Sequence, residues 1–220
     1  RISDSIHSQL ARDVNVPPSA SNTIKALTKE LLKTRLKSWA VSCWHMNDGE
    51  SEAMWRLYSD VSKGVAIKTS FNNLFHSLAN HEEPLNLFCD TVRYVDFENY
   101  EPSPQELEQT IPLPIYKAKS FIHENEFRLY IQNSINMQKT ALVDLSALGK
   151  QIEENTKDAI NECKTLPCNA NVLIQEVIIS PYTSEPFDSA VRAVSEKFGL
   201  QAPIKKSKLL DGYFFFNDDK

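Results

Sequence analysis

The residues with the clearest chemical potential are two glutamates and an arginine in one short segment, His123–Gln132. In its sequence, HENEFRLYIQ, the side chains of Glu124, Glu126 and Arg128 are spaced two residues apart. Alternate residues of a β-strand share a face at steps of about 6.5–7 Å, so we expect these three side chains on one face of a strand. Two close carboxylates push one pKa upward unless a cation lies nearby, and Arg128 could be that cation. The trio suits ribose binding, stabilisation of an oxocarbenium-like state or metal binding, and equally a solvated strand face of paired charges.

A second set of chemically capable residues lies in the segment Trp39–Thr69. Its pattern predicts a strand over Trp39–His45, a helix over Glu50–Val61 and a returning strand over Gly64–Thr69. Both faces of the first strand are largely apolar, so we expect a central strand that is covered on both sides. The candidate site residues here are one histidine, two tryptophans, two serines, a glutamate and a tyrosine: His45, Trp44, Trp55, Ser42, Ser51, Glu52 and Tyr58.

Two of these residues have a specific chemical interpretation. His45 could orient a ligand or transfer a proton, although a hydrogen-bonded core histidine fits the pattern as well. The apolar period of the helix predicts a buried stripe at Met54, Leu57, Tyr58 and Val61. Trp55 lies on a different stripe, where it could stack on a flat ligand such as a base, or pack beneath a loop. We predict that this segment and HENEFRLYIQ line one common cleft.

Length, charge and hydropathy limit the classes of function. The chain has 220 residues and 41% hydrophobic residues, which suits a single domain over residues 1–220. The net charge of −5 argues against a globally basic surface for nucleic acid, but lysines at every fourth position from Lys25 to Lys37 leave nucleic-acid binding open. No apolar run reaches the roughly 20 residues that span a bilayer, so no membrane association is expected.

The four cysteines bear on metal binding and on the compartment. Cys43 and Cys89 lie in apolar, strand-like runs, where buried free thiols are expected. Cys163 and Cys168 have no second pair that would complete a zinc site, so we predict no metal site. A reduced, cytoplasmic chain is expected, and a disulfide between Cys163 and Cys168 is the alternative.

The remaining pattern alternates helices and strands. It predicts an α+β fold, in which a mixed, largely antiparallel central sheet is flanked by helices. Residues 1–38 are a helical lead-in, residues 39–132 the core that carries the site, and residues 133–220 a C-terminal part. Further elements are expected as a helical run over Ile115–Ile122, a strand over Val172–Ser180, a helix over Ser184–Phe198 and a strand over Ala202–Leu209.

Several of these segments together resemble an uncharacterised bacterial domain-of-unknown-function family. The resemblance rests on SCWHMNDGESEAMWRLYS, GVAI, VRYVDF and K-x-x-x-F-x-HENEFRL, and it covers roughly Ser38–Ile131. A weaker similarity extends over Val172–Ser207. Members of that family begin with a further strand pair, so the resemblance implies that an N-terminal segment of the family is missing here.

The Glu-x-Glu strand is also similar to that of Arg–Ser–Glu-type ADP-ribosyltransferases. This resemblance implies that Glu126 stabilises an oxocarbenium-like state at the nicotinamide ribose, and that Glu124 orients or activates the acceptor. It further implies that Trp44 or Trp55 stacks on nicotinamide and that Ser42 bonds the ribose. NAD is then a candidate substrate, and no other cofactor is implied. The Ser-Thr-Ser triplet of those enzymes is absent from this sequence.

Three classes of function stay open at this point. The first is a nucleotide- or NAD-acting, transferase-like enzyme in a toxin or phage-defence context, with Glu124, Glu126, Arg128 and His45 as catalytic candidates. The second is a non-catalytic module that binds a ligand or a partner protein. The third is a metal-dependent nuclease or hydrolase. Formation of a homo-oligomer is open in each case.

Overall fold

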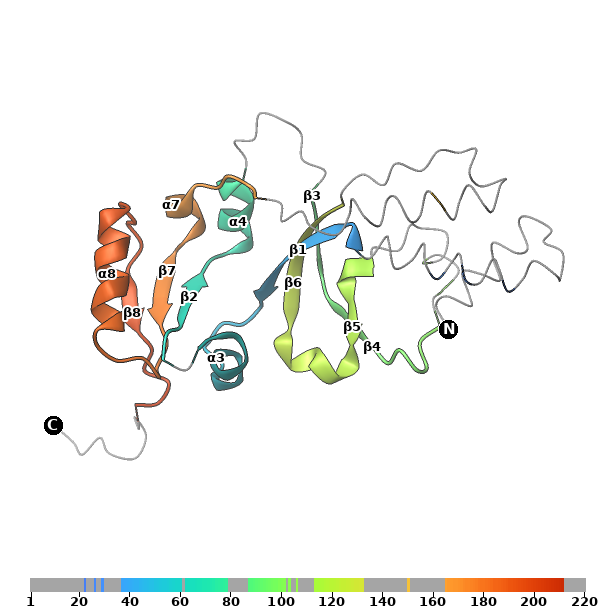
Figure 1. Cartoon of the computed structure of the whole chain (residues 1–220), viewed down its shortest axis with the longest axis horizontal. Coiled ribbons are helices and arrows are strands. Elements are labelled where there is room, and N and C mark those ends of the chain that lie inside the picture. Colours follow the sequence, from blue (N-terminus) through green and yellow to red (C-terminus); the bar gives the residue numbers. More distant parts are fainter. Residues whose placement is uncertain are drawn as a thin grey trace. The chain divides into compact units, whose positions relative to one another are not determined.

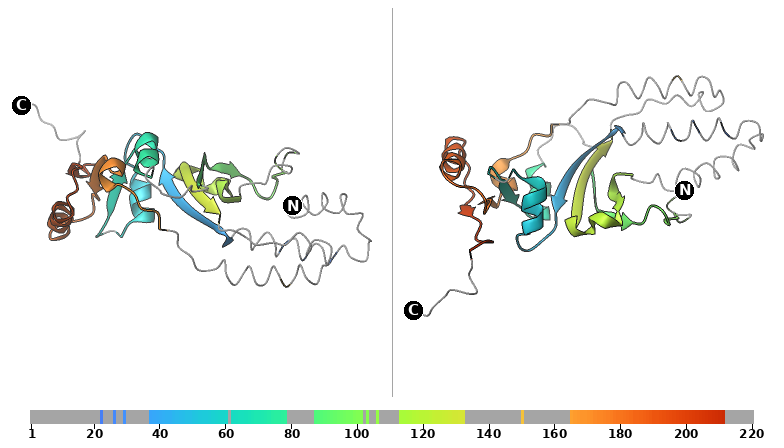
Figure 2. Two further views of the ribbon diagram at one scale, coloured as in Figure 1. Left: turned by 90° about the horizontal axis from the view of Figure 1, so that it is seen from above. Right: turned by 60° about the horizontal axis from the view of Figure 1, so that its bottom comes forward.

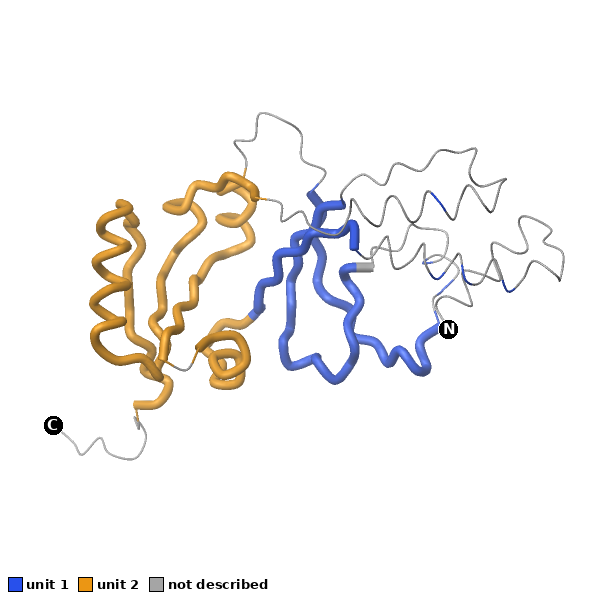
Figure 3. Tube along the Cα trace, in the orientation of Figure 1, with its two compact units in different colours: residues 1–46, 85–164 blue, residues 47–84, 165–220 orange. Residues whose placement is uncertain are grey.

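The computed structural model describes residues 37–60, 62–78, 87–101, 103, 106, 113–132 and 165–211, together with residues 22, 26, 29 and 150. The chain divides into two compact units (Figure 3). Unit 1 comprises Arg1–Met46 and Leu85–Lys164, and unit 2 comprises Asn47–Pro84 and Thr165–Lys220. Most of the expected helical lead-in and Cys163 lie outside the described residues. A single domain over the whole chain stays a prediction.

Unit 1 contains a three-stranded antiparallel sheet in the order β1-β6-β3 (Figure 1). Its strands are β1 (Trp39–His45), β6 (Glu126–Gln132) and β3 (Leu87–Thr91). The strand expected over Trp39–His45 is confirmed, but in the described sheet its central, fully covered position is wrong. β6 takes the central place because it bonds a strand on each side, and Val41 in the middle of β1 is 42% exposed.

Aromatic rings pack across this sheet beside the polar residues. The Tyr130 side chain is buried, and its ring centroid lies 5.5 Å from that of Trp39 and 5.7 Å from that of Phe88. Cys43 and Cys89 carry free thiols, as expected, but both are exposed, so their expected burial is wrong. The reason is that β1 and β3 are the outer strands of the described sheet, with one neighbour each.

The segment between the glutamate pair and β4 (Arg93–Val95) differs from expectation. The helical run expected over Ile115–Ile122 is wrong, because residues 116–118 form a strand that pairs in parallel with β4. Pairing of this kind overrides local helical spacing. The chain instead forms η2 (Leu113–Ile115), β5 (Tyr116–Ala118) and η3 (Lys119–Glu124). The expected strand over His123–Gln132 therefore begins at Glu126, and Glu124 is the last residue of a 3₁₀ helix.

Unit 2 is built on a mixed sheet in the order β2-β7-β8, in which β2 is antiparallel and β8 parallel to β7. Its strands are β2 (Val65–Lys68), β7 (Glu176–Ile179) and β8 (Ile204–Lys206). Its helices are α3 (Glu52–Tyr58), α4 (Phe71–Ser77), α7 (Ala170–Leu173) and α8 (Phe187–Lys197). The strand expected from Val172 starts late, because α7 occupies that position.

Close packing fixes one glycine of unit 2. A Cβ atom on Gly64 would lie 2.7 Å from Ser59 Oγ, so no larger residue fits without a shift. Gly64 also accepts a hydrogen bond from the backbone N–H of Ser180 at 2.9 Å. The start of β2 is therefore held directly against the end of β7.

The buried side of α3 also differs from expectation. Trp55 is buried, whereas Leu57 and Tyr58 are 60% and 63% exposed, so the expected buried stripe is wrong. The large Trp55 ring removes more apolar area from water than Leu57 can, and its indole N–H donates to Glu50 Oε2 at 3.0 Å. Ser51 is the N-cap of the helix and accepts from the Met54 N–H.

Both units combine helices with small sheets, so the predicted α+β class is confirmed. The sheets pair mostly in the antiparallel sense, and β1 and β6 run side by side in each view (Figure 2). Of the helices that the structure describes, none combines the length and the apolar character needed to cross a bilayer.

Candidate functional site

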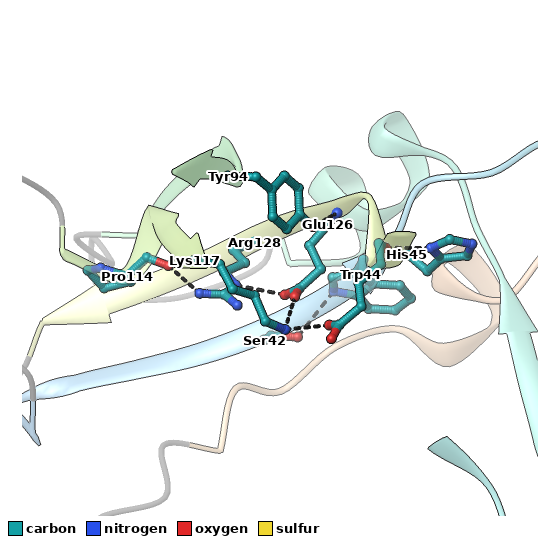
Figure 4. A network of polar contacts seen from close by, with 9 residues as sticks. Ser42, Trp44, His45, Tyr94, Pro114, Lys117, Glu126 and Arg128 are labelled. Atoms are coloured by element: carbon teal, nitrogen blue, oxygen red, sulfur yellow. Dashed lines mark hydrogen bonds and ion pairs between the residues drawn. The ribbon is translucent and has the colours of Figure 1, made fainter. Parts of the chain in front are cut away.

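Four charged side chains of unit 1 form one connected network (Figure 4). The Lys117 ammonium donates to a carboxylate oxygen of Glu124 and to Glu126 Oε1, the latter at 2.6 Å. Arg128 Nε donates to Glu126 Oε2 at 2.8 Å, and its Nη1 donates to the carbonyl of Pro114. Lys117 thus joins two carboxylates, and Arg128 fixes one of them to η2.

The network is largely buried. The side chains of Glu124 and Glu126 are 4% and 5% exposed, and those of Arg128 and Lys117 are 13% and 21% exposed. Lys117 Nζ lies 4.8 Å from the ring centroid of Phe121, a cation–π contact. Of the four charged groups, the Lys117 ammonium is the one most open to solvent.

The partners of Glu126 and Lys117 favour the charged forms of both side chains. Burial by itself would raise the pKa of Glu126, but hydrogen bonds from Arg128 and Lys117 outweigh it and hold that pKa well below its ordinary value. Burial would likewise lower the pKa of Lys117, but the two glutamates raise it. Cys43 is exposed as a residue, but partial desolvation of its thiol and a hydrogen bond to Glu126 raise the pKa of that thiol. The network therefore favours the ionised forms of Glu126, Lys117 and Arg128.

A buried network of charged groups stabilises a sheet less effectively than apolar packing does. Removal of two ion pairs from water costs several kcal/mol per ion, and apolar replacements of similar volume are often as stable or more stable. Buried groups whose pKa values are shifted by specific partners are typical of functional sites. This makes the four residues the candidate site that the structure supports best.

Backbone contacts fix the corner at which the two glutamates meet. His45 Nδ1 lies 2.6 Å from the carbonyl oxygen of Glu124. The Met46 N–H donates to the Asn125 carbonyl at 2.8 Å, and Asn125 Nδ2 donates back to the Met46 carbonyl at 2.5 Å. The Glu126 N–H donates to the hydroxyl of Tyr94 at 2.9 Å. The end of β1 is thus tied to the start of β6 on both sides of Asn125.

The strand register decides which predicted site residues share a face with the network. Cys43 lies opposite Arg128, and His45 lies opposite Glu126, so their side chains point to the network face. Ser42 and Trp44 point to the other face, where Trp44 Nε1 donates to Ser42 Oγ at 3.1 Å. The structure therefore brings Glu124, Glu126, Arg128 and His45 together but does not bring Ser42 and Trp44 to the carboxylates.

The other four predicted site residues, Ser51, Glu52, Trp55 and Tyr58, all belong to the α3 region of unit 2. Glu52 Oε1 accepts from Arg56 and from the Tyr182 hydroxyl, the latter at 2.6 Å. The Arg56 guanidinium also lies 5.3 Å from the Tyr182 ring centroid. Glu52, Arg56 and Tyr182 thus form a cluster within unit 2. A common cleft of the four predicted residues with the unit 1 network stays a prediction.

Sequence reasoning missed two residues of the network. Lys117 was not among the candidates, although K-x-x-x-F-x-HENEFRL begins with it, and a lysine seven residues before a glutamate pair is the available signal. Tyr94 lies in the VRYVDF segment, and only its proximity in space connects it to Glu126. The cation expected between the two carboxylates is therefore Lys117, and Arg128 binds Glu126 alone.

A second polar cluster supports the β5 side of the network. Glu106 Oε1 accepts from the hydroxyls of Tyr100 and Tyr116, both at 2.7 Å, and from Arg93 Nη1 at 3.2 Å. Glu106 Oε2 accepts from the Ser103 N–H, and Ser103 Oγ accepts from the Glu106 N–H, which is a capping box. The hydrogen bonds from Tyr116 and Ser103 lower the pKa of Glu106 to about 2. Tyr116 precedes Lys117, so this cluster helps to hold β5 in place.

The described residues offer no set of ligands for a metal ion. Within them, no three His, Cys, Asp or Glu side chains are arranged to hold a metal ion. The metal-dependent nuclease or hydrolase stays a prediction that this part of the chain does not support.

Comparison with known proteins gives one finding. A family model described as "Protein of unknown function (DUF2971)" matches residues 54–129, a stretch that includes Lys117, both glutamates of the network and Arg128. No curated protein and no solved structure matches the chain. The similarity to ADP-ribosyltransferases therefore stays a prediction. Over residues 54–129, the chain is similar to an uncharacterised family of proteins of unknown function.

Proposed function

We propose that the network of Lys117, Glu124, Glu126 and Arg128 is the centre of a transferase-like activity on a nucleotide or NAD-like substrate. The observation that carries this proposal is a buried carboxylate, Glu126, which Arg128 and Lys117 keep ionised. A carboxylate of this kind stabilises positive charge that develops on a sugar ring, because the surrounding protein screens it less than water would.

The chemistry that follows is transfer at the nicotinamide ribose. The bond between C1′ and the nicotinamide nitrogen breaks, and nicotinamide leaves with the electron pair. Glu126 faces the positive charge at C1′ while an acceptor oxygen or nitrogen forms the new bond and loses its proton to Glu124. Lys117 sets the distance between the two carboxylates. We include a toxin or phage-defence context in this proposal because the Glu-x-Glu strand resembles that of ADP-ribosyltransferases.

One observation favours a second function, a module that binds a ligand or partner without chemistry. Each oxygen of the Glu126 carboxylate already accepts a hydrogen bond inside the protein, one from Lys117 and one from Arg128. The four charges also neutralise one another. A network of this kind can hold a binding surface in shape and take no part in a reaction.

The two functions are separated by NAD binding and nicotinamide release. The full chain is titrated with NAD⁺ up to millimolar concentration by calorimetry, and released nicotinamide is measured by chromatography. Glu126→Gln keeps the shape of the side chain and removes its charge. The matched control is Glu176→Gln in unit 2, since Glu176 is also a largely buried glutamate, 16% exposed, paired with a lysine.

The transferase proposal expects binding and release in the native chain and in Glu176→Gln, and at least tenfold less release in Glu126→Gln, with an unchanged circular dichroism spectrum. Binding without release in every variant would favour the binding module. Absence of NAD⁺ binding at millimolar concentration in the native chain would contradict the NAD-directed proposal.

A further inference from the structure

The two glutamates of the network meet the same ammonium although they belong to different elements. Glu124 ends η3, Glu126 begins β6, and Asn125 alone separates them. A continuous strand would have carried Glu124 onward past the end of β1. The chain instead turns at Asn125, so that β5 and its Lys117 return beside the first residue of β6.

This turn uses an uncommon backbone conformation. Asn125 has φ +39° and ψ +64°, in the left-handed region. Among the described residues, Asn125 is the one non-glycine residue with positive φ. Asparagine tolerates that region better than most residues, whereas β-branched residues do not. Strained backbone that persists at one position points to a local requirement for it.

Three hydrogen bonds tie the turn to the end of β1, besides the bond from the Asn125 N–H to the Ile122 carbonyl at 3.2 Å. Two join Asn125 to Met46, through the Asn125 carbonyl and through its side-chain amide. The third joins His45 to the carbonyl of Glu124. A carbonyl oxygen can only accept, so His45 Nδ1 carries the hydrogen and donates it, which fixes the tautomer. Figure 4 shows the His45 ring directed away from Lys117.

We propose that Asn125 and His45 are positioning residues: the left-handed turn at Asn125, held by the hydrogen bond from His45, places the Glu124 carboxylate on Lys117. His45 then acts on the site through the Glu124 backbone. This inference does not depend on which reaction, if any, the network performs.

The test is the energetic coupling between this corner and Glu124, read from hydrogen exchange of the β6 amides in the full chain. The β6 amides report the opening of the strand that carries Glu126 and Arg128. Glu124→Gln is introduced into the native chain and into four variants: Asn125→Gly, Asn125→Val, His45→Asn and His45→Leu. Glycine keeps the left-handed backbone, and an asparagine at position 45 keeps a donor near the place of Nδ1.

Three backgrounds should respond strongly to Glu124→Gln: the native chain, Asn125→Gly and His45→Asn. In each of them Glu124→Gln should speed hydrogen exchange of the β6 amides about tenfold or more, because it breaks a buried ion pair. In Asn125→Val the same change should speed exchange less than about threefold, since the carboxylate no longer faces Lys117. In His45→Leu the acceleration should fall between these limits. If Asn125→Val does not fold, Asn125→Ala replaces it, with the same expected direction.

Glu176→Gln is the control. It breaks the ion pair with Lys205, which shares no residue with this corner or with the network, so its effect on β6 exchange should be equal in all backgrounds. Equal effects of Glu124→Gln in the Asn125→Val and Asn125→Gly backgrounds would overturn the role of Asn125. Equal effects in His45→Leu and the native chain would overturn the role of His45. Neither outcome depends on NAD. This test can therefore fail while the proposed function stands, and the proposed function can fail while this test succeeds.

Discussion

Glu126 in unit 1 and Glu52 in unit 2 are the same residue type with similar partners but different surroundings. Each accepts a hydrogen bond from an arginine on its own element, Arg128 in β6 and Arg56 in α3. Each also has a second donor, Lys117 for Glu126 and the Tyr182 hydroxyl for Glu52. The Glu126 side chain is 5% exposed, whereas that of Glu52 is 44% exposed.

This difference in burial decides what the two clusters can contribute. An exposed ion pair is screened by water and adds little to stability. The α3 cluster therefore has a small energetic effect and needs no functional explanation. A buried network costs desolvation energy, and here it holds Glu126 in its ionised form, which is typical of functional sites. Glu52 and three of the four unit 1 network residues were predicted as site residues, and the comparison favours the unit 1 network as the candidate site.

The largest expected effect is that of Lys117→Met. It leaves two carboxylates buried side by side without the ammonium that joins them, so the free energy of unfolding of unit 1 should fall by about 3 kcal/mol or more. This loss in unfolding free energy is measured by urea titration, with hydrogen exchange of the β6 amides as the probe of unfolding.

The control for this change is Lys205→Met in unit 2. Lys205 pairs with Glu176, but its side chain is 67% exposed, so we expect a loss below about 1 kcal/mol. Equal losses in Lys117→Met and Lys205→Met would show that burial does not distinguish the two pairs.

A smaller effect is expected from acid. The pKa of Glu106 is lowered to about 2 and that of Glu126 is lowered as well, so both carboxylates prefer the folded, ionised form. Their stabilisation is complete above the unfolded pKa of about 4.3 and is lost as pH falls toward 2. Each should contribute about 1–3 kcal/mol to the decrease in unfolding free energy over that window, measured by urea unfolding at several pH values. Glu126→Gln and Glu106→Gln should each flatten the curve, and an unchanged slope in either would refute that assignment.

A modest rate effect is expected at the thiols. Burial and the hydrogen bond to Glu126 raise the pKa of Cys43, so less thiolate is present at pH 8. Cys89 lies on the opposite face of the same sheet and serves as the internal reference. Iodoacetamide should alkylate Cys43 about three- to tenfold more slowly than Cys89, as followed by peptide mass spectrometry. Glu126→Gln should reduce the difference between the alkylation rates of Cys43 and Cys89. Equal rates for the two thiols in the native chain would count against the hydrogen bond between Cys43 and Glu126.

The smallest effect is expected in unit 2. Glu52→Gln removes the charge that meets Arg56 and Tyr182 at an exposed position, so thermal unfolding should hardly change. A loss comparable to that of Lys117→Met would reverse the ranking of the two clusters.

Local patterns predicted the elements whose signals are periodic. The strand Trp39–His45 and the helix inside Ser184–Phe198 follow their apolar periods, and both are confirmed. The run Ile115–Ile122 misled because its spacing also fits a helix, while pairing of Tyr116–Ala118 with β4 decides the outcome. Such pairing is not visible in a local window.

The candidate site shows the same limit. Alternation in HENEFRLYIQ predicted that Glu124, Glu126 and Arg128 share one strand face. The register confirms this for Glu126 and Arg128, but it is wrong for Glu124, which ends η3. The left-handed turn at Asn125 and the approach of Lys117 were not predictable, because both depend on how η3 returns the chain to β6. Nor could local sequence reveal that Ser42 and Trp44 lie on the other face from Glu126, since the register of β1 against β6 decides it.

The most direct test of the buried network is the titration of the Glu126 carboxyl carbon by ¹³C NMR in the full chain, with assignment by Glu126→Gln. If Lys117 and Arg128 hold this carboxylate as described, its pKa lies well below the ordinary value of about 4.3 and it stays ionised until strongly acid pH. A midpoint at or above about 4.3 would contradict both the network and the function proposed for it.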